Sequence, residues 1–263
     1  MAALLPAIHG HARATTRLHP RPGRPAAGQS SLGGPLLWPV GEPWPVCAEP
    51  STHATVFADR PPGPMVPVLQ LFAADVPGVP FPFGADLLQL LWCPTEHEAD
   101  DMFERPWTRM TPVCRVFWRD STSVELVDPR LPGPVPDEEF VPRPCVLRPE
   151  VVADYPHVLE LTPDELTEVV DSGVDYDQLG PAPGSKVGGW VEWAQEREVP
   201  FCDQGHEMAH LLTVASVEDW DNSWTPGLDA ARNPSGLMIA DGGGYHVFTC
   251  VHCPDRPIVA VTQ

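Results

Sequence analysis

The chain has 263 residues, which is enough to bury a substantial core in one domain or in two closely joined halves. A hydrophobic content of 43% and nine tryptophans exclude a wholly disordered protein, and a formal net charge of −20 argues against nucleic acids and anionic membranes as partners. With 35 prolines and 21 glycines, the chain is expected to form short strands, many turns and few helices.

Residues 1–32 are predicted to form an N-terminal arm that lies against the acidic body or stays mobile, because four arginines precede the first acidic residue, Glu42. The apolar start, residues 1–8, lacks a preceding basic region and is too short for a secretory core, and no later segment has the roughly 18 apolar residues of a membrane span. Seven cysteines, an odd number, fit thiols or metal ligands better than a disulfide framework. We therefore expect a cytoplasmic protein.

The first sheet-rich half is predicted to span residues 33–150. Apolar runs and alternating patterns indicate its strands, which are expected at residues 67–73, 86–94, 113–119 and 124–127. Residues 131–149 are dense in proline and should form an irregular crossover to the second half. The cysteine in this crossover, Cys145, is expected to be a small core residue.

The clearest helix should begin near Thr162, at the start of the second half, residues 151–263. Thr162 can cap it, Pro163 suits the first helical position, Glu165 completes a capping box, and Gly173 fits just past the end. Three apolar side chains then share one face of the helix: Leu166, Val169 and Val170. This face predicts a helix that packs on a sheet.

The remainder of the second half repeats the order of the first. A strand is expected at residues 210–215, a polar loop follows, and a closing strand lies within residues 236–254. Aligning Gly34 with Gly189 also aligns Trp38 with Trp193, and Cys93-Pro and Cys253-Pro end corresponding strands. We therefore predict an internally duplicated, mainly β α+β fold with two pseudo-symmetric halves and few short helices.

The segment from Ser185 to Gln195 holds the chain's only lysine beside a pair of glycines and two tryptophans. Half-exposed aromatic rings beside glutamines would suit a groove that accepts an extended peptide. The candidate binding residues are Trp38, Gln70, Lys186, Gly188, Gly189, Trp193 and Gln195. The alternative is that Trp38, Trp44, Trp190 and Trp193 only fix the glycine loops to the core.

Cys250 and Cys253 have the spacing of two ligands of a tetrahedral zinc ion. Cys202 could supply a third ligand, and His206 or His252 a fourth; we assign Cys202, His206, Cys250 and Cys253. Such a zinc ion would be structural, since a catalytic one needs an open position and a general base. The alternative is that these cysteines are ordinary small core residues.

Residues 206–210 match the His-Glu-x-x-His pattern, in which two histidines one helical turn apart bind zinc and the glutamate activates water. The residues that follow, 211–215, are typical of a strand. On a strand His206 and His210 would lie roughly 13 Å apart and could not share an ion. A zinc metallohydrolase using His206, Glu207 and His210 is therefore kept as the alternative function, and no catalytic residue is assigned.

The spaced motifs Lys186-Val-Gly-Gly with Trp193 and Gln195, Leu211-Leu-Thr-Val and the segment 244–254 resemble the YwqG-like family of uncharacterised bacterial proteins. More distantly, the chain is similar to the programmed-cell-death-2 proteins of eukaryotes, which are associated with escorting a newly made ribosomal protein. The resemblance implies a duplicated, mainly β α+β fold and a protein-binding or chaperone-like role. We therefore predict a non-enzymatic intracellular protein, chaperone-like or immunity-type, whose partner is another polypeptide. Relatives often carry a second cysteine near Cys202, which this chain lacks.

Overall fold

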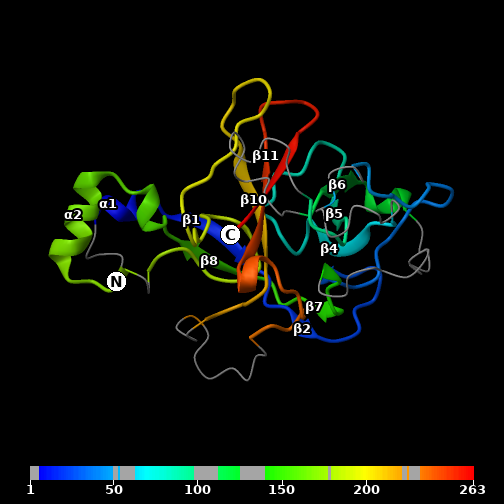
Figure 1. Ribbon diagram of the computed structural model, residues 1–263, viewed down its shortest axis with the longest axis horizontal. Coiled ribbons are helices and arrows are strands. Elements are labelled where there is room, and N and C mark those ends of the chain that lie inside the picture. The colour runs from blue at the N-terminus through cyan, green and yellow to red at the C-terminus, as the bar shows by residue number, and fades with distance from the viewer. Residues whose placement is uncertain are drawn as a thin grey trace.

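The protein consists of two β sheets and two short α helices, which lie at one end of the computed structural model shown in Figure 1. The structure describes residues 6–49, 53, 63–97, 112–124, 140–176, 179–220, 224 and 232–263. Each sheet is antiparallel and has six strands. The predicted mainly β fold class is thereby confirmed. Among the described residues, none of the helices has the length and apolar character that a membrane span requires.

Sheet A occupies the centre of Figure 1. Its strands, in spatial order, are β12 (Ile258–Thr262), β11 (Gly244–Thr249), β10 (Ala209–Ala215), β9 (Lys186–Gly188), β1 (Arg13–Arg17) and β8 (Glu150–Asp154). β11 is rich in β-branched and aromatic residues and is buried along its whole length, and the last five residues of β10 are buried as well. These two strands therefore form the centre of the fold on this side.

Sheet B lies on the other side of the core. Its strands, in spatial order, are β2 (Arg21–Pro22), β7 (Cys145–Val146), β3 (Ser31–Leu32), β4 (Val66–Phe72), β5 (Leu87–Trp92) and β6 (Cys114–Arg119). The main hydrophobic core draws residues from both sheets, and the rings of Trp92 and Tyr245 meet across it with centroids 5.0 Å apart. The two sheets thus share one core.

The two sheets correspond strand by strand. Replacing β9–β12 with β3–β6, β1 with β7, and β8 with β2 converts the spatial order of sheet A into that of sheet B. The registers agree too, because the β4/β5 pair shifts between Pro67 and Leu69 and the β10/β11 pair shifts between His210 and Leu212. This agreement in order and register is compatible with the predicted internal duplication.

The first strand of the chain differs from the predicted N-terminal arm. β1 lies inside sheet A, paired with β8 on one side and β9 on the other. Thr15, Thr16 and Arg17 are buried there, and Arg17 Nε donates to the Pro183 carbonyl. The prediction placed these arginines on an arm that lies against the acidic body or stays mobile, whereas Arg17 is held in the interior by this hydrogen bond. The predicted boundary at residues 150/151 falls at the start of β8, where the chain enters sheet A.

Most of the predicted strands are present. β4, β5, β6 and β10 lie at the expected segments of residues 67–73, 86–94, 113–119 and 210–215. Cys145 is fully buried in β7, as expected of a small core residue. Of the strand expected at 124–127, residues 125–127 lie outside the described part of the chain.

The predicted helix is α2, Pro163–Ser172. Thr162 and Glu165 form the predicted capping box, and Gly173 ends the helix with φ of 66°. Its packing differs from the prediction, because Val169 is buried whereas Leu166 and Val170 are 41% and 70% exposed. Val169 packs with Ile8 of α1 (Pro6–His9) and with Tyr176, so α2 covers this small cluster and not the face of a sheet.

The capping box of α2 provides a first testable prediction. Thr162→Ala should lower the free energy of unfolding by about 1 kcal/mol, because the N–H of Glu165 then loses its side-chain acceptor. Urea denaturation measures the change. Thr167→Ala is the matched control, since the Thr167 hydroxyl only bonds back to the Pro163 carbonyl within the helix. Equal losses in the two variants would contradict a role for the cap.

Candidate metal centres and ligand pocket

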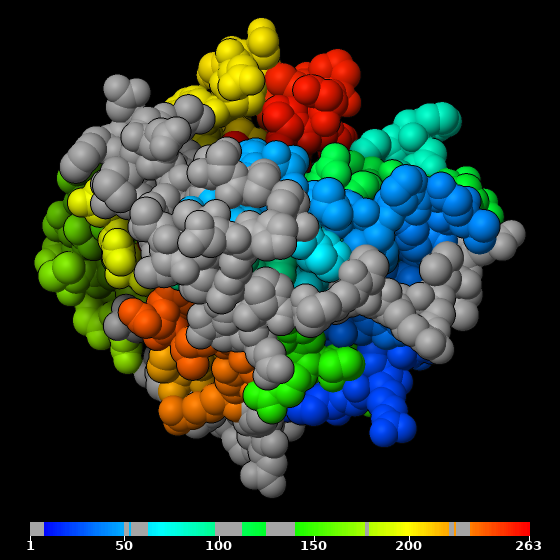
Figure 2. Space-filling view, turned by 45° about the vertical axis from the view of Figure 1, so that its right-hand side comes forward, coloured from blue at the N-terminus to red at the C-terminus, as the bar shows by residue number. Residues whose placement is uncertain are grey.

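The predicted metal ligands Cys202, His206, Cys250 and Cys253 come together at one end of sheet A. Cys202 and His206 lie in the turn before β10, and Cys250 and Cys253 lie just after β11. Because β10 and β11 are antiparallel neighbours, the start of one meets the end of the other. The two loops lie side by side at the top of Figures 1 and 2, coloured yellow and red.

The spacing of these four ligand atoms fits one metal ion. His206 Nδ1 lies 3.5, 3.7 and 3.6 Å from the sulfurs of Cys202, Cys250 and Cys253. The Cys202 and Cys253 sulfurs are 3.8 Å apart. Tetrahedral bonds of about 2.3 Å to sulfur and about 2.0 Å to nitrogen require separations of roughly 3.6 Å for S···N and roughly 3.8 Å for S···S. The four atoms therefore sit near the corners of such a tetrahedron.

The sequence left His206 and His252 as alternatives for the fourth ligand. In the structure His206 is the one that lies in the cluster. The ring of His252 lies 5.1 Å from that of His206, centroid to centroid, outside the four-atom group. Cys202 and Cys250 are buried against a hydrophobic cluster that includes Trp193 and Phe248. A metal here would fasten the two loops to the sheet.

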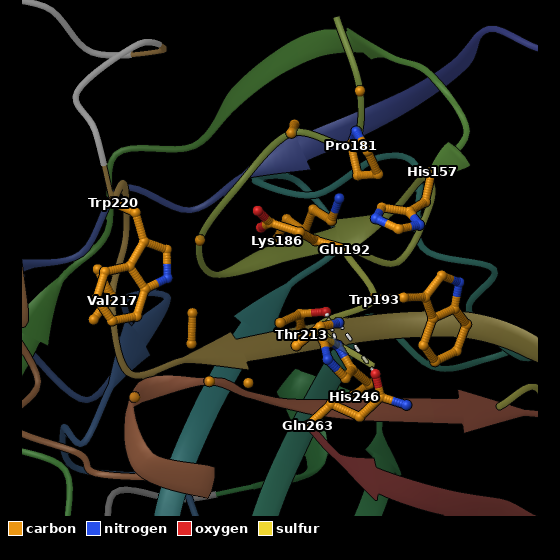
Figure 3. Close-up of a pocket in the computed structure, with 18 of the residues that line it drawn as sticks. His157, Pro181, Lys186, Glu192, Trp193, Thr213, Val217, Trp220, His246 and Gln263 are labelled. Carbon is orange, nitrogen blue, oxygen red and sulfur yellow. Dashed lines mark hydrogen bonds between the residues drawn. The ribbon is translucent and has the colours of Figure 1, made fainter. Parts of the chain in front are cut away.

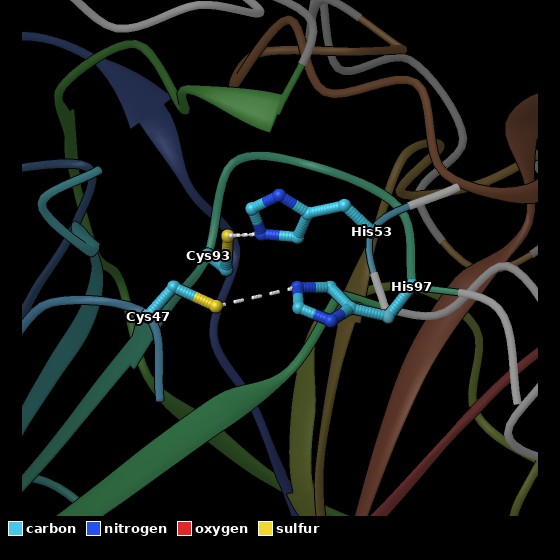
Figure 4. A group of neighbouring side chains, drawn as sticks. All are labelled: Cys47, His53, Cys93 and His97. Atoms are coloured by element: carbon cyan, nitrogen blue, oxygen red, sulfur yellow. Dashed lines mark hydrogen bonds between the residues drawn. The ribbon is translucent and has the colours of Figure 1, made fainter. Parts of the chain in front are cut away.

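A second cluster, which the sequence analysis missed, lies at the corresponding end of sheet B. It consists of Cys47, His53, Cys93 and His97, all buried (Figure 4). Cys47 Sγ is 3.7 Å from His97 Nε2, and Cys93 Sγ is 3.6 Å from His53 Nε2, again the S···N separation of a tetrahedral site. These four residues can also hold one metal ion.

The two clusters occupy equivalent places in the two halves. Cys47 and Cys202 are 155 positions apart, as are Trp38 and Trp193, and Cys93 and Cys250 directly follow β5 and β11. The sequence analysis aligned Cys93 with Cys253, which is wrong by three positions, because the structural equivalent of Cys93 is Cys250. Extending the spacing of 155 beyond the tryptophans would have pointed to Cys47.

The thiols of the second cluster are close enough to alter each other's ionisation. The contact with Cys93 is the largest cause that lowers the pKa of Cys47, to about 3, and the same contact raises the pKa of Cys93. The contact therefore favours the thiolate form of Cys47 and disfavours that of Cys93. The thiolate is the form that binds metals, so the cluster is prepared for a cation.

The His-Glu-x-x-His stretch is not organised as a catalytic site. Residues 206–208 are not helical, Glu207 forms an isolated antiparallel bridge with Phe201, and His210 lies in β10. His206 points to the cysteines, whereas His210 bonds to the Gly188 carbonyl at 3.1 Å and to Thr213 at 2.9 Å. Since the two imidazoles have separate partners, they do not form a shared metal site.

The four tryptophans of the two glycine loops favour the structural alternative. Trp38 and Trp193 are only 3% and 4% exposed. The indole N–H of Trp44 donates to the Met65 carbonyl, and that of Trp190 donates to the His11 carbonyl. These rings fix the loops to the body and do not line an open aromatic groove.

The other candidate binding residues have mostly structural contacts. Gln70 is fully buried, and Gln195, which is exposed, donates its backbone N–H to the Gln263 side chain. The Gly188 carbonyl accepts from His210, and Gly189 has φ of 73° and no room for a side chain, since a Cβ would fall on Asp154 Oδ2.

Lys186 is buried and faces Asp154. Its ammonium lies 3.3 Å from Asp154 Oδ2, and the same carboxylate accepts from the backbone N–H groups of Ala182 and Trp190 at 2.6 and 2.7 Å. Burial lowers the pKa of Lys186, and the Asp154 charge opposes that shift. The conspicuous Lys-Val-Gly-Gly motif thus builds a buried polar network.

This network borders a cavity of about 250 Å³ above sheet A (Figure 3). Two of the predicted binding residues, Lys186 and Trp193, line it. Trp220 lines it as well and lies opposite Trp193 in the view of Figure 3. Glu192 and His246, which the sequence analysis did not single out, line it as well. Trp38 and Gln70 belong to the equivalent region of the first half, so the predicted binding set is divided between two places.

Comparison with known proteins found no match to any protein-family model, and no curated protein was similar to the chain. The resemblance to the YwqG-like family accordingly stays a prediction.

Proposed function

We propose that the protein is a non-enzymatic binding module in which two structural zinc ions fix the loops of a paired β scaffold and which binds another polypeptide. The observation that supports polypeptide binding best is the free edge of sheet A at β8. No other strand in the described part of the chain pairs with its outer side. An extended peptide can add to such an edge through main-chain hydrogen bonds.

The proposal of structural zinc rests on the ligand sets. One cluster offers three thiolates and one imidazole, and the other offers two of each, which are the ordinary donor sets of structural zinc. In both clusters all four corners of the tetrahedron are filled by protein atoms. A catalytic zinc keeps one position for water or substrate, so these sets favour a structural role.

The proposal of a peptide-binding edge rests on the composition of β8. Protein edges exposed to water are often protected by charged residues or a covering segment. β8 begins with the exposed Glu150, but its next three residues are apolar: Val151, which is 60% exposed, Val152, and the exposed Ala153. A partner strand would cover these side chains and satisfy the outer backbone groups at the same time.

We also propose that the chain belongs to the YwqG-like family and is located in the cytoplasm. Two matched sheets, each with a glycine loop and an indole ring buried against it, support membership of the YwqG-like family. None of the seven cysteines, all of which lie in the described part of the chain, forms a disulfide, which supports a reducing compartment such as the cytoplasm.

The proposed edge can be tested by capture of partners from the native cell. The wild-type chain should retain a polypeptide at useful stoichiometry, and Val151→Lys should lose it, because a charge on a strand edge opposes pairing with another strand. Val170→Lys is the matched control, since Val170 is exposed on α2 and not on the edge. The result is read by quantitative mass spectrometry of the captured material.

Retention of the same partner by both variants would contradict the β8 site. Recovery of no partner by the wild-type chain would contradict polypeptide binding as a whole. Circular dichroism of both variants keeps loss of binding distinct from loss of folding.

A further inference from the structure

The region of the first half that corresponds to the cavity is closed by hydrogen bonds. Gln70 on β4 faces Gln89 on β5, and the two side-chain amides bond to each other at 3.0 Å. Together they hold both backbone groups of Leu37: Gln70 accepts from its N–H, and Gln89 donates to its carbonyl. The loop after β3 is thereby tied down onto sheet B.

The second half replaces these residues with a different set. By strand register, Thr213 stands where Gln70 does and His246 where Gln89 does. The spacing that aligns Trp38 with Trp193 places Glu192 at the position of Leu37. Thr213 and His246 bond to each other at 2.9 Å instead of reaching the loop. The loop that carries Glu192 therefore lacks the hydrogen bonds that hold Leu37 to sheet B in the first half, and the cavity of about 250 Å³ lies between this loop and sheet A.

The hydrogen bonds beneath the cavity fix which nitrogen of His246 carries a proton. The Gly188 carbonyl can only accept, so His210 Nδ1 is protonated and its Nε2 must accept from the Thr213 hydroxyl. That hydroxyl then accepts from His246 Nδ1. Burial lowers the pKa of both histidines, that of His246 to about 3, so both rings are neutral. His246 Nε2 is left as an acceptor for a group in the cavity.

Two groups of opposite charge also border the cavity. The Lys186 ammonium has three donors, and its one hydrogen-bond partner in the described part of the chain is Asp154. Glu192 is exposed to solvent at the edge of the cavity and makes neither a hydrogen bond nor an ion pair with any described residue. Each charge therefore keeps hydrogen-bonding capacity toward the cavity.

We infer that this cavity binds a free α-amino acid, with the carboxylate of the ligand at Lys186 and its ammonium at Glu192 and His246. A zwitterion can use both the remaining donors of Lys186 and the carboxylate oxygens of Glu192, whereas a simple anion or a simple cation leaves one of these two groups without a ligand partner. The volume is below the roughly 300–1,000 Å³ typical of sites for drug-sized molecules, which fits so small a ligand. Trp220, Val217 and Ala215 offer apolar surface for its side chain.

Isothermal titration of the full chain with each of the twenty free amino acids tests the site, with leucine as the reference probe for an apolar side chain. Leucine should bind more tightly than 4-methylpentanoate, which lacks the ammonium, and 3-methylbutylamine, which lacks the carboxylate. Glu192→Gln should weaken leucine binding about tenfold or more, because a charge-assisted hydrogen bond is lost. Glu196→Gln is the matched control, since it removes the same charge from an exposed neighbouring side chain that does not line the cavity.

A second variant separates loss of the site from loss of folding. Thr213→Gln combined with His246→Gln installs the residues of the first half and should fill the cavity, abolishing binding while the metal content is unchanged. Absence of binding by every amino acid at millimolar concentration would overturn the inference. So would equal affinity for either single-charge analogue, or an unchanged affinity in Glu192→Gln. The site is separate from the β8 edge, so either proposal can fail alone.

Discussion

Under the proposal of two structural zinc ions per chain, Cys93→Ser should lower the zinc content of the protein from two ions to one and strongly destabilise the first half. Cys93 lies directly after β5, and its sulfur is one corner of the cluster that ties the chain near Cys47 to the chain near His97. Zinc binding by small structural sites contributes on the order of 10–16 kcal/mol in peptides, which is comparable to the whole stability of a typical domain, roughly 5–15 kcal/mol. A loss of about 5 kcal/mol or more is therefore expected.

Metal analysis by mass spectrometry and urea denaturation measure this effect together. Cys145→Ser is the matched control, because Cys145 is equally buried but lies in β7, away from both clusters. It should keep both zinc ions and show only the cost of a hydroxyl in the core. Equal stability losses in the two variants, with unchanged zinc content, would show that the Cys47 cluster is not a metal site.

Asp154→Ala should lower the free energy of unfolding by about 3–5 kcal/mol, the usual cost of removing one partner of a buried ion pair. The change leaves the Lys186 ammonium without its counter-charge in the interior. It also leaves the N–H groups of Ala182 and Trp190 without their acceptor, and these groups hold the segments on either side of the cavity. Urea denaturation followed by tryptophan fluorescence measures the loss.

The control for this change is Asp171→Ala, which removes a carboxylate from the exposed end of α2 and should alter stability by no more than about 0.5 kcal/mol. Adding Lys186→Met to Asp154→Ala should recover part of the loss, because the unpaired charge is then removed as well. No recovery in the double variant would mean that the two backbone N–H groups, and not the ammonium, account for the effect.

The strands and the helix were predictable because their signals are local. β4, β5 and β10 are mostly apolar, with one or two polar residues each, and α2 carries its cap, its first-turn proline and its terminal glycine within twelve residues, Thr162 to Gly173. What α2 packs against was not predictable, since Leu166, Val169 and Val170 are equally apolar in sequence. The position of α1 decides that Val169 alone is buried.

The metal clusters show a similar division. The Cys-x-x-Cys spacing identified Cys250 and Cys253, because two ligands of one ion lay close together in the chain. Cys47, His53, Cys93 and His97 form two short pairs about 40 residues apart, and neither pair has a recognised ligand spacing. Only the antiparallel pairing of β4 with β5 brings these two loops to the same end of sheet B.

The sequence by itself determined that the molecule is a mainly β protein with little helix, because proline and glycine content, alternation and apolar runs act within a few residues of each other. It also determined which residue types were available for metal binding. The tertiary structure decided where the first strand lies, since β1 finds its hydrogen-bond partners in β8 and β9, more than 130 residues away. It likewise decided that one half encloses a cavity where the other is closed, because that difference depends on which side chains face each other across strands.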